Sequence, residues 1–223
     1  MEKNIMENAF SGNILLYLLI PVAFLLGSIP FGIIFTKGSG IDIRSVGSMN
    51  IGATNVLRSA GKVPAILTLL GDILKGSVAV ILCRIVLVKV VQPGSETGIP
   101  AGTEDLWLGI ISLTAVLGHM LSVFLKFRGG KGVATGFGVM IVYSPPVAGL
   151  MLLVWIAAAV SFKYSSLSAL ISVSIMPFLL LMFGASGIKI IFGILLALII
   201  IYKHKTNIRA LLDGTEEKIG HKE

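Results

Sequence analysis

The sequence predicts an all-α, polytopic integral membrane protein with seven transmembrane helices, some of them short. Hydrophobic residues make up 55% of the 223 residues and charged residues only 13%, whereas soluble domains carry about a quarter charged residues. Apolar runs of the length that crosses a bilayer recur along the chain. The polar segments between them are too short to bury a core of their own, so we expect one domain over residues 1–223.

Seven apolar segments are the candidate spans. The first three are runs of about 20 residues or more, which is the length a helix needs to cross the hydrocarbon core. The last two are somewhat shorter and are bounded by polar or glycine-containing turns. In chain order the segments are Ile14–Phe35, Val63–Val91, Leu106–Leu125, Val133–Ser144, Val147–Phe162, Leu167–Phe183 and Ile188–Tyr202.

The fourth and fifth spans come from dividing one apolar stretch, Val133–Phe162. As a continuous helix it would extend about 45 Å, well beyond a hydrocarbon core of roughly 30 Å. Pro145 and Pro146 lie near its middle, and proline ends helices, so we expect two helices. The first of them would extend only about 18 Å and must be tilted or lie partly in the bilayer. Five spans remain the alternative.

The positions of Lys and Arg predict the orientation. These residues concentrate in Thr36–Lys62, Lys126–Gly132 and the tail 203–223, whereas the loop Gln92–Asp105 has acidic residues and neither Lys nor Arg. Short positively charged loops stay in the cytoplasm. We therefore expect the N-terminus outside, with residues 1–13 as an external tail, and the C-terminus in the cytoplasm. This orientation requires an odd number of spans.

Composition also excludes several classes of function. The net charge of +7 is explained by cationic loops that face anionic headgroups, and no nucleic-acid-binding pattern accompanies it. Cys83 is the single cysteine, which excludes an intrachain disulfide and a cysteine-based metal cluster. No spacing of histidine and carboxylate residues suggests a metal site. We expect no metal, no cofactor and no nucleic-acid partner.

Three polar blocks interrupt the apolar sequence: Ser45–Arg58, Lys126–Thr135 and Lys203–Arg209. With seven spans all three lie on the cytoplasmic side, together with Lys163–Ser168. If they meet there, they form a site for an anion, most simply a phosphate. Ser45–Arg58 combines hydroxyls, amides and glycines with the planar guanidinium of Arg58, which suits phosphate oxygens. The alternative for this block is an ordinary capped helix start at the interface.

The second block contains a glycine-rich turn, Gly129-Gly130-Lys131-Gly132, that precedes a predicted helix. Exposed N–H groups and a helix N-terminus can bind an anion, and Lys131 adds a point charge. The turn does not match the nucleotide P-loop, because Leu125 and Gly132 replace the required Gly and Ser or Thr. The alternative is a flexible, positively charged cytoplasmic loop.

The remaining polar residues have both structural and functional interpretations. Asp72 and Lys75 lie three residues apart in a span, and we favour a mutually neutralising pair. His119, also in a span, is expected to be a packing residue. His204 lies among cationic residues and is a better site candidate; the alternative for this segment is plain anchoring of the tail by its positive charge. Serines in Lys163–Ser168 are expected to cap the following helix.

These blocks together resemble the bacterial PlsY family of membrane-embedded glycerol-3-phosphate acyltransferases, which use acyl phosphate as donor. Met49 departs from the family pattern, where glycine is common, and Ser122 replaces a common proline. Neither departure removes a polar group that we assign to the site. The matching segments are GSIPFG at Gly27–Gly32, VGSMNIGATNVLR at Val46–Arg58, DILKG at Asp72–Gly76, LGH at Leu117–His119, FRGGKGVAT at Phe127–Thr135, KYSSLS at Lys163–Ser168 and IYKHKTNIRALLDGTE at Ile201–Glu216.

The resemblance implies seven spans and a reaction at the cytoplasmic face of the bacterial inner membrane. Acyl phosphate and sn-glycerol 3-phosphate would give 1-acyl-sn-glycerol 3-phosphate (lysophosphatidic acid) and phosphate, the first acylation of phospholipid biosynthesis. It implies substrates and membrane lipid as partners, a monomer, and no cofactor. The implied catalytic residues are Ser48, Asn50, Lys131, His204 and Asn207, and the implied substrate-binding residues are Gly52, Thr54, Asn55, Arg58, Gly129, Gly130, Gly132 and Ser166.

The resemblance leaves the proton acceptor open. His204 or a phosphate oxygen of the substrate could take the proton of the attacking hydroxyl. Two other functions compete: an anion transporter, which would need polar residues through the full bilayer depth, and a membrane phosphatase, whose paired histidine and arginine motifs are missing. The spans after Val133 carry little charge, which disfavours the transporter.

Overall fold

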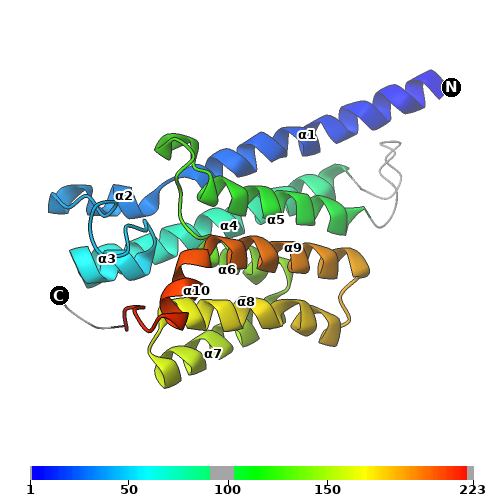
Figure 1. Ribbon diagram of the computed structural model, residues 1–223. Helices are drawn as coiled ribbons and strands as arrows, with labels where there is room; N and C mark the ends of the chain where they lie inside the picture. The colour runs from blue at the N-terminus through cyan, green and yellow to red at the C-terminus, as the bar shows by residue number, and fades with distance from the viewer. Residues whose placement is uncertain (1, 91–102, 220–223) are drawn as a thin grey trace.

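The computed structural model describes residues 2–90 and 103–219, and this part of the chain is helical without strands (Figure 1). The prediction of an all-α protein is confirmed for these residues. Short 3₁₀ turns occur at Lys37–Ser39 (η1) and Val123–Leu125 (η2). The α-helices are α1 (Glu2–Ser28), α2 (Phe31–Thr36), α3 (Ala53–Ala60), α4 (Lys62–Val90), α5 (Glu104–Met120), α6 (Val133–Tyr143), α7 (Pro145–Phe162), α8 (Ser165–Met182), α9 (Gly187–Lys203) and α10 (Lys205–Leu212).

Each of the seven predicted spans contains a helix. In the described residues five helical segments are long and apolar enough to cross a membrane, and a sixth qualifies if α9 and α10, which meet at 60°, count as one. The apolar helix α6 has only 11 residues and falls short of a full crossing. The five are Ile14–Ser39, Lys62–Lys89, Glu104–Leu125, Pro145–Phe162 and Ser165–Met182.

Both predicted tails contain helix. Residues predicted as an external tail are helical from Glu2 onward, as the start of α1. The tail that we predict to be cytoplasmic contains α10 and a following segment that packs against the bundle. Most of the predicted external loop, residues 91–102, lies outside the described residues.

The prediction of a break at the proline pair is confirmed. α6 ends at Tyr143 and α7 begins at Pro145, with Ser144 between them in a non-helical conformation at φ −153° and ψ 87°. Pro145 occupies the first turn of α7, where its missing N–H breaks no helical hydrogen bond. The break therefore yields two helices from one apolar stretch.

Small residues bring the helices close together. A Cβ on Gly138 of α6 would lie 2.0 Å from the Ile73 carbonyl oxygen of α4, and one on Gly118 of α5 would lie 2.2 Å from the Phe24 carbonyl oxygen of α1. Hydrocarbon chains and apolar side chains are equally apolar, so close backbone packing is what holds membrane helices together. Figure 1 shows α1 lying along α5 and α4, with α9 between α5 and α8 and with α7 packed against α8 on the side away from α1.

The outer surface of the bundle is apolar. Only 22% of the apolar stretch is buried in the first candidate span, Ile14–Ser39, and the same holds for α7. Leu18 and Leu153 are among the side chains left exposed. In water such a surface would be unstable, whereas lipid tails solvate it. The buried core lies between the helices, where its largest fully buried side chains include Leu16, Ile111, Met140, Met176, Leu180 and Ile200.

The polar segments gather at one end of the bundle, the end of α2, α3 and α10 in Figure 1, away from the N-terminus. Side-chain contacts join all four of the segments that the seven-span topology places together. The contacts are Arg58 with Glu217, Lys131 with Asn207, and Thr54 with Ser165. The predicted meeting of the polar blocks is thus observed.

Candidate functional site

A cavity of about 490 Å³ opens among the four polar segments. All predicted site residues line it except Gly129 and Gly130. One part is polar, with side chains from α3, α8, α10 and the loops before α3 and α6. The other part extends between the helices and is apolar, lined by Ile73, Phe137, Met151, Trp155, Val173, Met176 and Leu196. The cavity therefore has room for a molecule with a polar head and a hydrocarbon chain.

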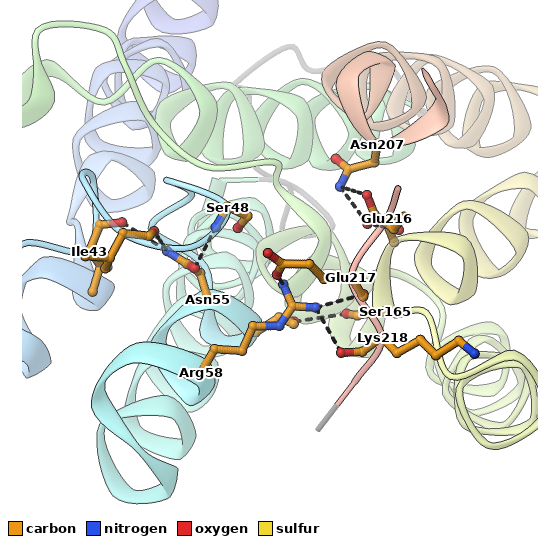
Figure 2. Close-up of polar contacts among 12 residues, drawn as sticks. Ile43, Ser48, Asn55, Arg58, Ser165, Asn207, Glu216, Glu217 and Lys218 are labelled. Carbon is orange, nitrogen blue, oxygen red and sulfur yellow. Dashed lines mark hydrogen bonds and ion pairs between the residues drawn. The ribbon is translucent and has the colours of Figure 1, made fainter. Parts of the chain in front are cut away.

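Asn55 organises the loop that precedes α3 (Figure 2). Its Nδ2 donates to the carbonyl oxygens of Ile43 at 2.9 Å and Val46 at 3.1 Å, and its Oδ1 accepts from the backbone N–H of Ser48 at 3.0 Å. Asn55 is 1% exposed, so its amide is committed to the loop. The loop in turn presents Ser48 to the cavity.

The same loop explains the departure at Met49. Met49 has a φ of 54°, in the left-handed region that glycine enters without steric cost. Other L-residues pay roughly 1–2 kcal/mol there. A glycine at this position would therefore suit the backbone, and the exposed Met49 side chain lies outside the cavity lining.

Gly129 and Gly130 pack against the end of α5 instead of lining the cavity. Their N–H groups donate to the carbonyl oxygens of Met120 and His119, each at 3.1 Å. A Cβ on Gly129 would lie 1.9 Å from the His119 carbonyl oxygen, and one on Gly130 would lie 2.2 Å from His119 Nε2. The two glycines thus permit a close approach that places Lys131 at the cavity.

A charged cluster lies beneath this turn. Lys75 Nζ lies 2.8 Å from Asp72 Oδ1, which confirms the predicted pair, and His119 Nδ1 lies 3.5 Å from the same oxygen. Lys75 also donates to the carbonyl oxygen of Ile29 at 2.8 Å. The three side chains are buried, as intramembrane charges must be when lipid surrounds the protein. Asp72 and His119 also line the cavity, so His119 is more than the packing residue that we expected.

Lys131 belongs to a network that continues into the tail. Its Nζ donates to Asn207 Oδ1 at 2.5 Å, and Asn207 Nδ2 donates to Glu216 Oε1 at 2.8 Å. Ser166 Oγ donates to the same Glu216 oxygen. Burial lowers the pKa of Lys131 and the nearby Arg58 acts in the same direction, while Glu216 opposes them. Glu216 is the last residue of the segments that carry the resemblance, and nothing local in the sequence indicates these contacts.

Arg58 is held by the residue after Glu216 (Figure 2). Its Nη1 forms an ion pair with the carboxylate of Glu217, and its Nη2 donates to the carbonyl oxygens of Glu217 at 2.9 Å and Lys218 at 3.4 Å. Arg58 thus forms an ion pair with a carboxylate 159 residues away in the sequence. A capped helix start alone does not account for this block.

The serines of the α7–α8 turn do not cap α8, so that prediction is wrong. The N-cap of α8 is Tyr164, without a side-chain capping bond. Ser165 instead shares a hydrogen bond of 2.9 Å with Thr54, and Ser166 binds Glu216. Ser168 Oγ donates to the Tyr164 carbonyl oxygen at 2.7 Å. The hydroxyls of Ser165 and Ser166 therefore form hydrogen bonds with distant segments and not with the N-terminal turn of α8.

His204 lies at the bend between α9 and α10 and is buried. Its Nδ1 lies 2.8 Å from the Ile200 carbonyl oxygen. A carbonyl oxygen only accepts, so Nδ1 carries the hydrogen and neutral His204 keeps the lone pair on Nε2. With the residue in the cavity lining, this nitrogen is the acceptor that His204 offers to a ligand.

Comparison with known proteins identifies relatives over nearly the whole length. The family model described as glycerol-3-phosphate acyltransferase matches residues 17–214. Curated proteins of that name from Rubrobacter xylanophilus and from a Bradyrhizobium species are 40% identical over 203 residues and 46% identical over 202 residues. The alignments cover 91% and 90% of this chain and 94% and 93% of those proteins.

The fold also matches solved structures. Crystal structures of PlsY, an integral membrane glycerol 3-phosphate acyltransferase, superpose with a TM-score of 0.81 in the glycerol 3-phosphate form and 0.79 in the lysophosphatidic acid form. Sequence identity is 37% and 36%, and each comparison covers 92% of this chain. The matches cover 96% and 95% of the solved chains.

Proposed function

The chain belongs to the glycerol-3-phosphate acyltransferase family, and from this premise we propose that it acylates sn-glycerol 3-phosphate to 1-acyl-sn-glycerol 3-phosphate (lysophosphatidic acid). The donor is acyl phosphate and the second product is phosphate, so the reaction is the first acylation of phospholipid biosynthesis. The observation that carries the proposal is the cavity with one polar, cationic part and one apolar part. A phosphate fits the first and an acyl chain the second.

The substrates are assigned to parts of the cavity by charge. Arg58, Lys131 and Ser166 hold the phosphate of glycerol 3-phosphate, because they combine two cations with a hydroxyl. The loop before α3 and the start of α3 line the acyl-phosphate region, with Asn55 supporting the loop. The residues of that region are Ser48, Asn50, Gly52, Thr54 and Asn55. Gly129 and Gly130 position Lys131, and Gly132 lines the cavity beside it.

The reaction breaks one bond and forms one. The 1-hydroxyl oxygen of glycerol 3-phosphate attacks the acyl carbonyl carbon, the bond from that carbon to the phosphate oxygen breaks, and phosphate leaves with the bonding electrons. The hydroxyl proton passes to Nε2 of His204, which has the free lone pair. Acyl phosphate is already activated, so positioning and charge stabilisation supply most of the catalysis. Asn207 keeps Lys131 in place at the phosphate.

We place the protein in the bacterial inner membrane as a monomer with seven spans, the N-terminus outside and the active site at the cytoplasmic face. The charge distribution supports this orientation, because the segments that meet at the cavity are those rich in Lys and Arg. In this arrangement α9 is the last span, α10 belongs to the cytoplasmic tail, and the short α6 is a further span that lies tilted against its neighbours.

The test uses purified protein in lipid with acyl phosphate and glycerol 3-phosphate. Phosphate and lysophosphatidic acid are followed together, without added metal. We expect both to appear in equal amounts and only when glycerol 3-phosphate is present. Phosphate without lysophosphatidic acid would indicate a hydrolase. If folded protein forms neither product, the result would favour an anion transporter.

A further inference from the structure

The segment after α10 lines part of the cavity and is held by backbone hydrogen bonds at both ends; we call residues 213–219 the C-terminal strap. At its start Gly214 has a φ of 70° and the N–H of Thr215 donates to the Ala210 carbonyl oxygen at 2.8 Å. At its end the N–H of Ile219 donates to the Lys163 carbonyl oxygen at 2.7 Å. Between these anchors, Glu216 and Glu217 line the cavity.

The two adjacent carboxylates of the strap have different surroundings (Figure 2). Glu216 accepts hydrogen bonds from Ser166 and from Asn207, two neutral donors of the site. The Glu217 side chain is 40% exposed, and Arg58 is the partner of its carboxylate within the described residues. Glu217 is therefore the carboxylate that can leave its partner with little rearrangement.

The anion-binding position at Arg58 is thus occupied by a carboxylate of the protein itself, that of Glu217. The Arg58 side chain is 16% exposed and lies in the cavity, where the proposed function puts a substrate phosphate. Carboxylate and phosphate use the same pair of guanidinium N–H groups. Arg58 Nε is buried and has no acceptor in the described part of the chain, so the strap leaves the guanidinium incompletely satisfied.

We propose that Glu217 is a built-in competitor for the phosphate of glycerol 3-phosphate, and that substrate binding releases it from Arg58. This proposal rests on the proposed function. The phosphate dianion carries more charge than the carboxylate and can engage Nε together with an Nη, so it displaces Glu217. The competition raises the glycerol 3-phosphate concentration that the enzyme needs. Partly exposed ion pairs are weak, so the effect is about two- to fivefold.

Glu217→Gln tests the competition, because it removes the charge and keeps the side-chain shape. Glycerol 3-phosphate binding is measured by calorimetry without donor, and KM and kcat are measured by lysophosphatidic acid formation. We expect Kd and KM for glycerol 3-phosphate to fall about two- to fivefold, with kcat not lowered. Glu217→Asp retains the charge but reaches less far, so we expect a smaller fall in Kd and KM for glycerol 3-phosphate. This variant serves as the test if the Gln variant does not fold.

Asp42→Asn is the matched control. Asp42 also pairs with an arginine, Arg44 at 2.9 Å, and the change in charge is the same, but this pair is exposed and outside the cavity. We expect its KM to equal that of the wild type. An unchanged or raised Kd in folded Glu217 variants would overturn the competition. Wild-type protein that neither binds nor acylates glycerol 3-phosphate would overturn the proposed function instead.

Discussion

Lys131 reaches the cavity through contacts on both of its sides. On one side Gly129 and Gly130 pack against the end of α5, and on the other Asn207 accepts from its ammonium group. Glu216 binds the Nδ2 group of Asn207, which leaves Oδ1 turned toward Lys131. The lysine is thereby held before a substrate arrives, which reduces the entropy lost on binding.

Lys131→Ala is expected to raise KM for glycerol 3-phosphate about 10- to 100-fold. A hydrogen bond to a charged group contributes about 1.5–3 kcal/mol, and the alanine variant loses it. Initial rates over a range of glycerol 3-phosphate at fixed acyl phosphate measure the effect. Lys126→Ala is the control, because Lys126 is exposed and lies outside the cavity lining. An unchanged requirement in Lys131→Ala would remove this residue from phosphate binding.

His204→Ala is expected to lower kcat by about 100-fold or more, the loss typical of a missing general base. The prediction follows from the Nδ1 contact with Ile200, which leaves Nε2 as the proton acceptor. Single-turnover rates at saturating substrate isolate the chemical step, and thermal unfolding checks that the variant is folded. Near-normal turnover would assign the proton to a phosphate oxygen of the substrate.

At the level of elements, two junctions decide where the site lies. The bend of 60° between α9 and α10 turns α10 away from the axis of α9, so that Asn207 lies in the cavity. The break at Ser144 folds one apolar stretch into α6 and α7, which both contribute to the apolar part. Both junctions therefore bring side chains to the cavity that a straight helix would have carried past it.

Gly138→Ala is expected to destabilise the protein by about 1–3 kcal/mol, the usual cost of overpacking. The added Cβ would lie 2.0 Å from the Ile73 carbonyl oxygen, so α4 and α6 must separate. Thermal unfolding of the detergent-purified protein measures the loss. Gly149→Ala on α7 is the matched control, because a Cβ there meets nothing within 4 Å. Equal stability of the two variants would contradict this account of the α4–α6 contact.

At the scale of the whole molecule, the bundle has chemically different ends. The end near the cavity collects Arg58, Lys131 and the strap. At another junction, between the starts of α5 and α9, Asp105 accepts from Ser186 at 2.6 Å and pairs with Lys189 at 3.2 Å. The seven crossings that we propose would account for this separation, since each crossing carries the chain to the other end.

Cysteine labelling tests the orientation. Cys83 is fully buried, so single cysteines introduced at exposed positions can be read against a low background. The preparation keeps the inner membrane sealed and exposes its outer side to a membrane-impermeant maleimide. Under these conditions Glu104→Cys is expected to react. Lys126→Cys is expected to react only after the membrane is permeabilised. The reverse pattern would place the cavity on the outer side.

The sequence by itself determined the helical membrane class, the positions of the apolar helices, the break at the proline pair and the polar blocks. It could do so because bilayer thickness imposes long apolar runs, and because proline and buried charge act locally. The family resemblance also named residues that line the cavity, such as Ser48, Lys131 and Asn207.

Only the tertiary structure decided which polar groups meet. Glu217 lies 159 residues from Arg58, and Ser165 lies 111 residues from Thr54, so no local pattern links them. The same holds for Gly129 and Gly130, whose N–H groups donate to α5 rather than point into the cavity. Hydrogen-bond partners are chosen by which chain segments pack together, and that choice arises only when the whole bundle has formed.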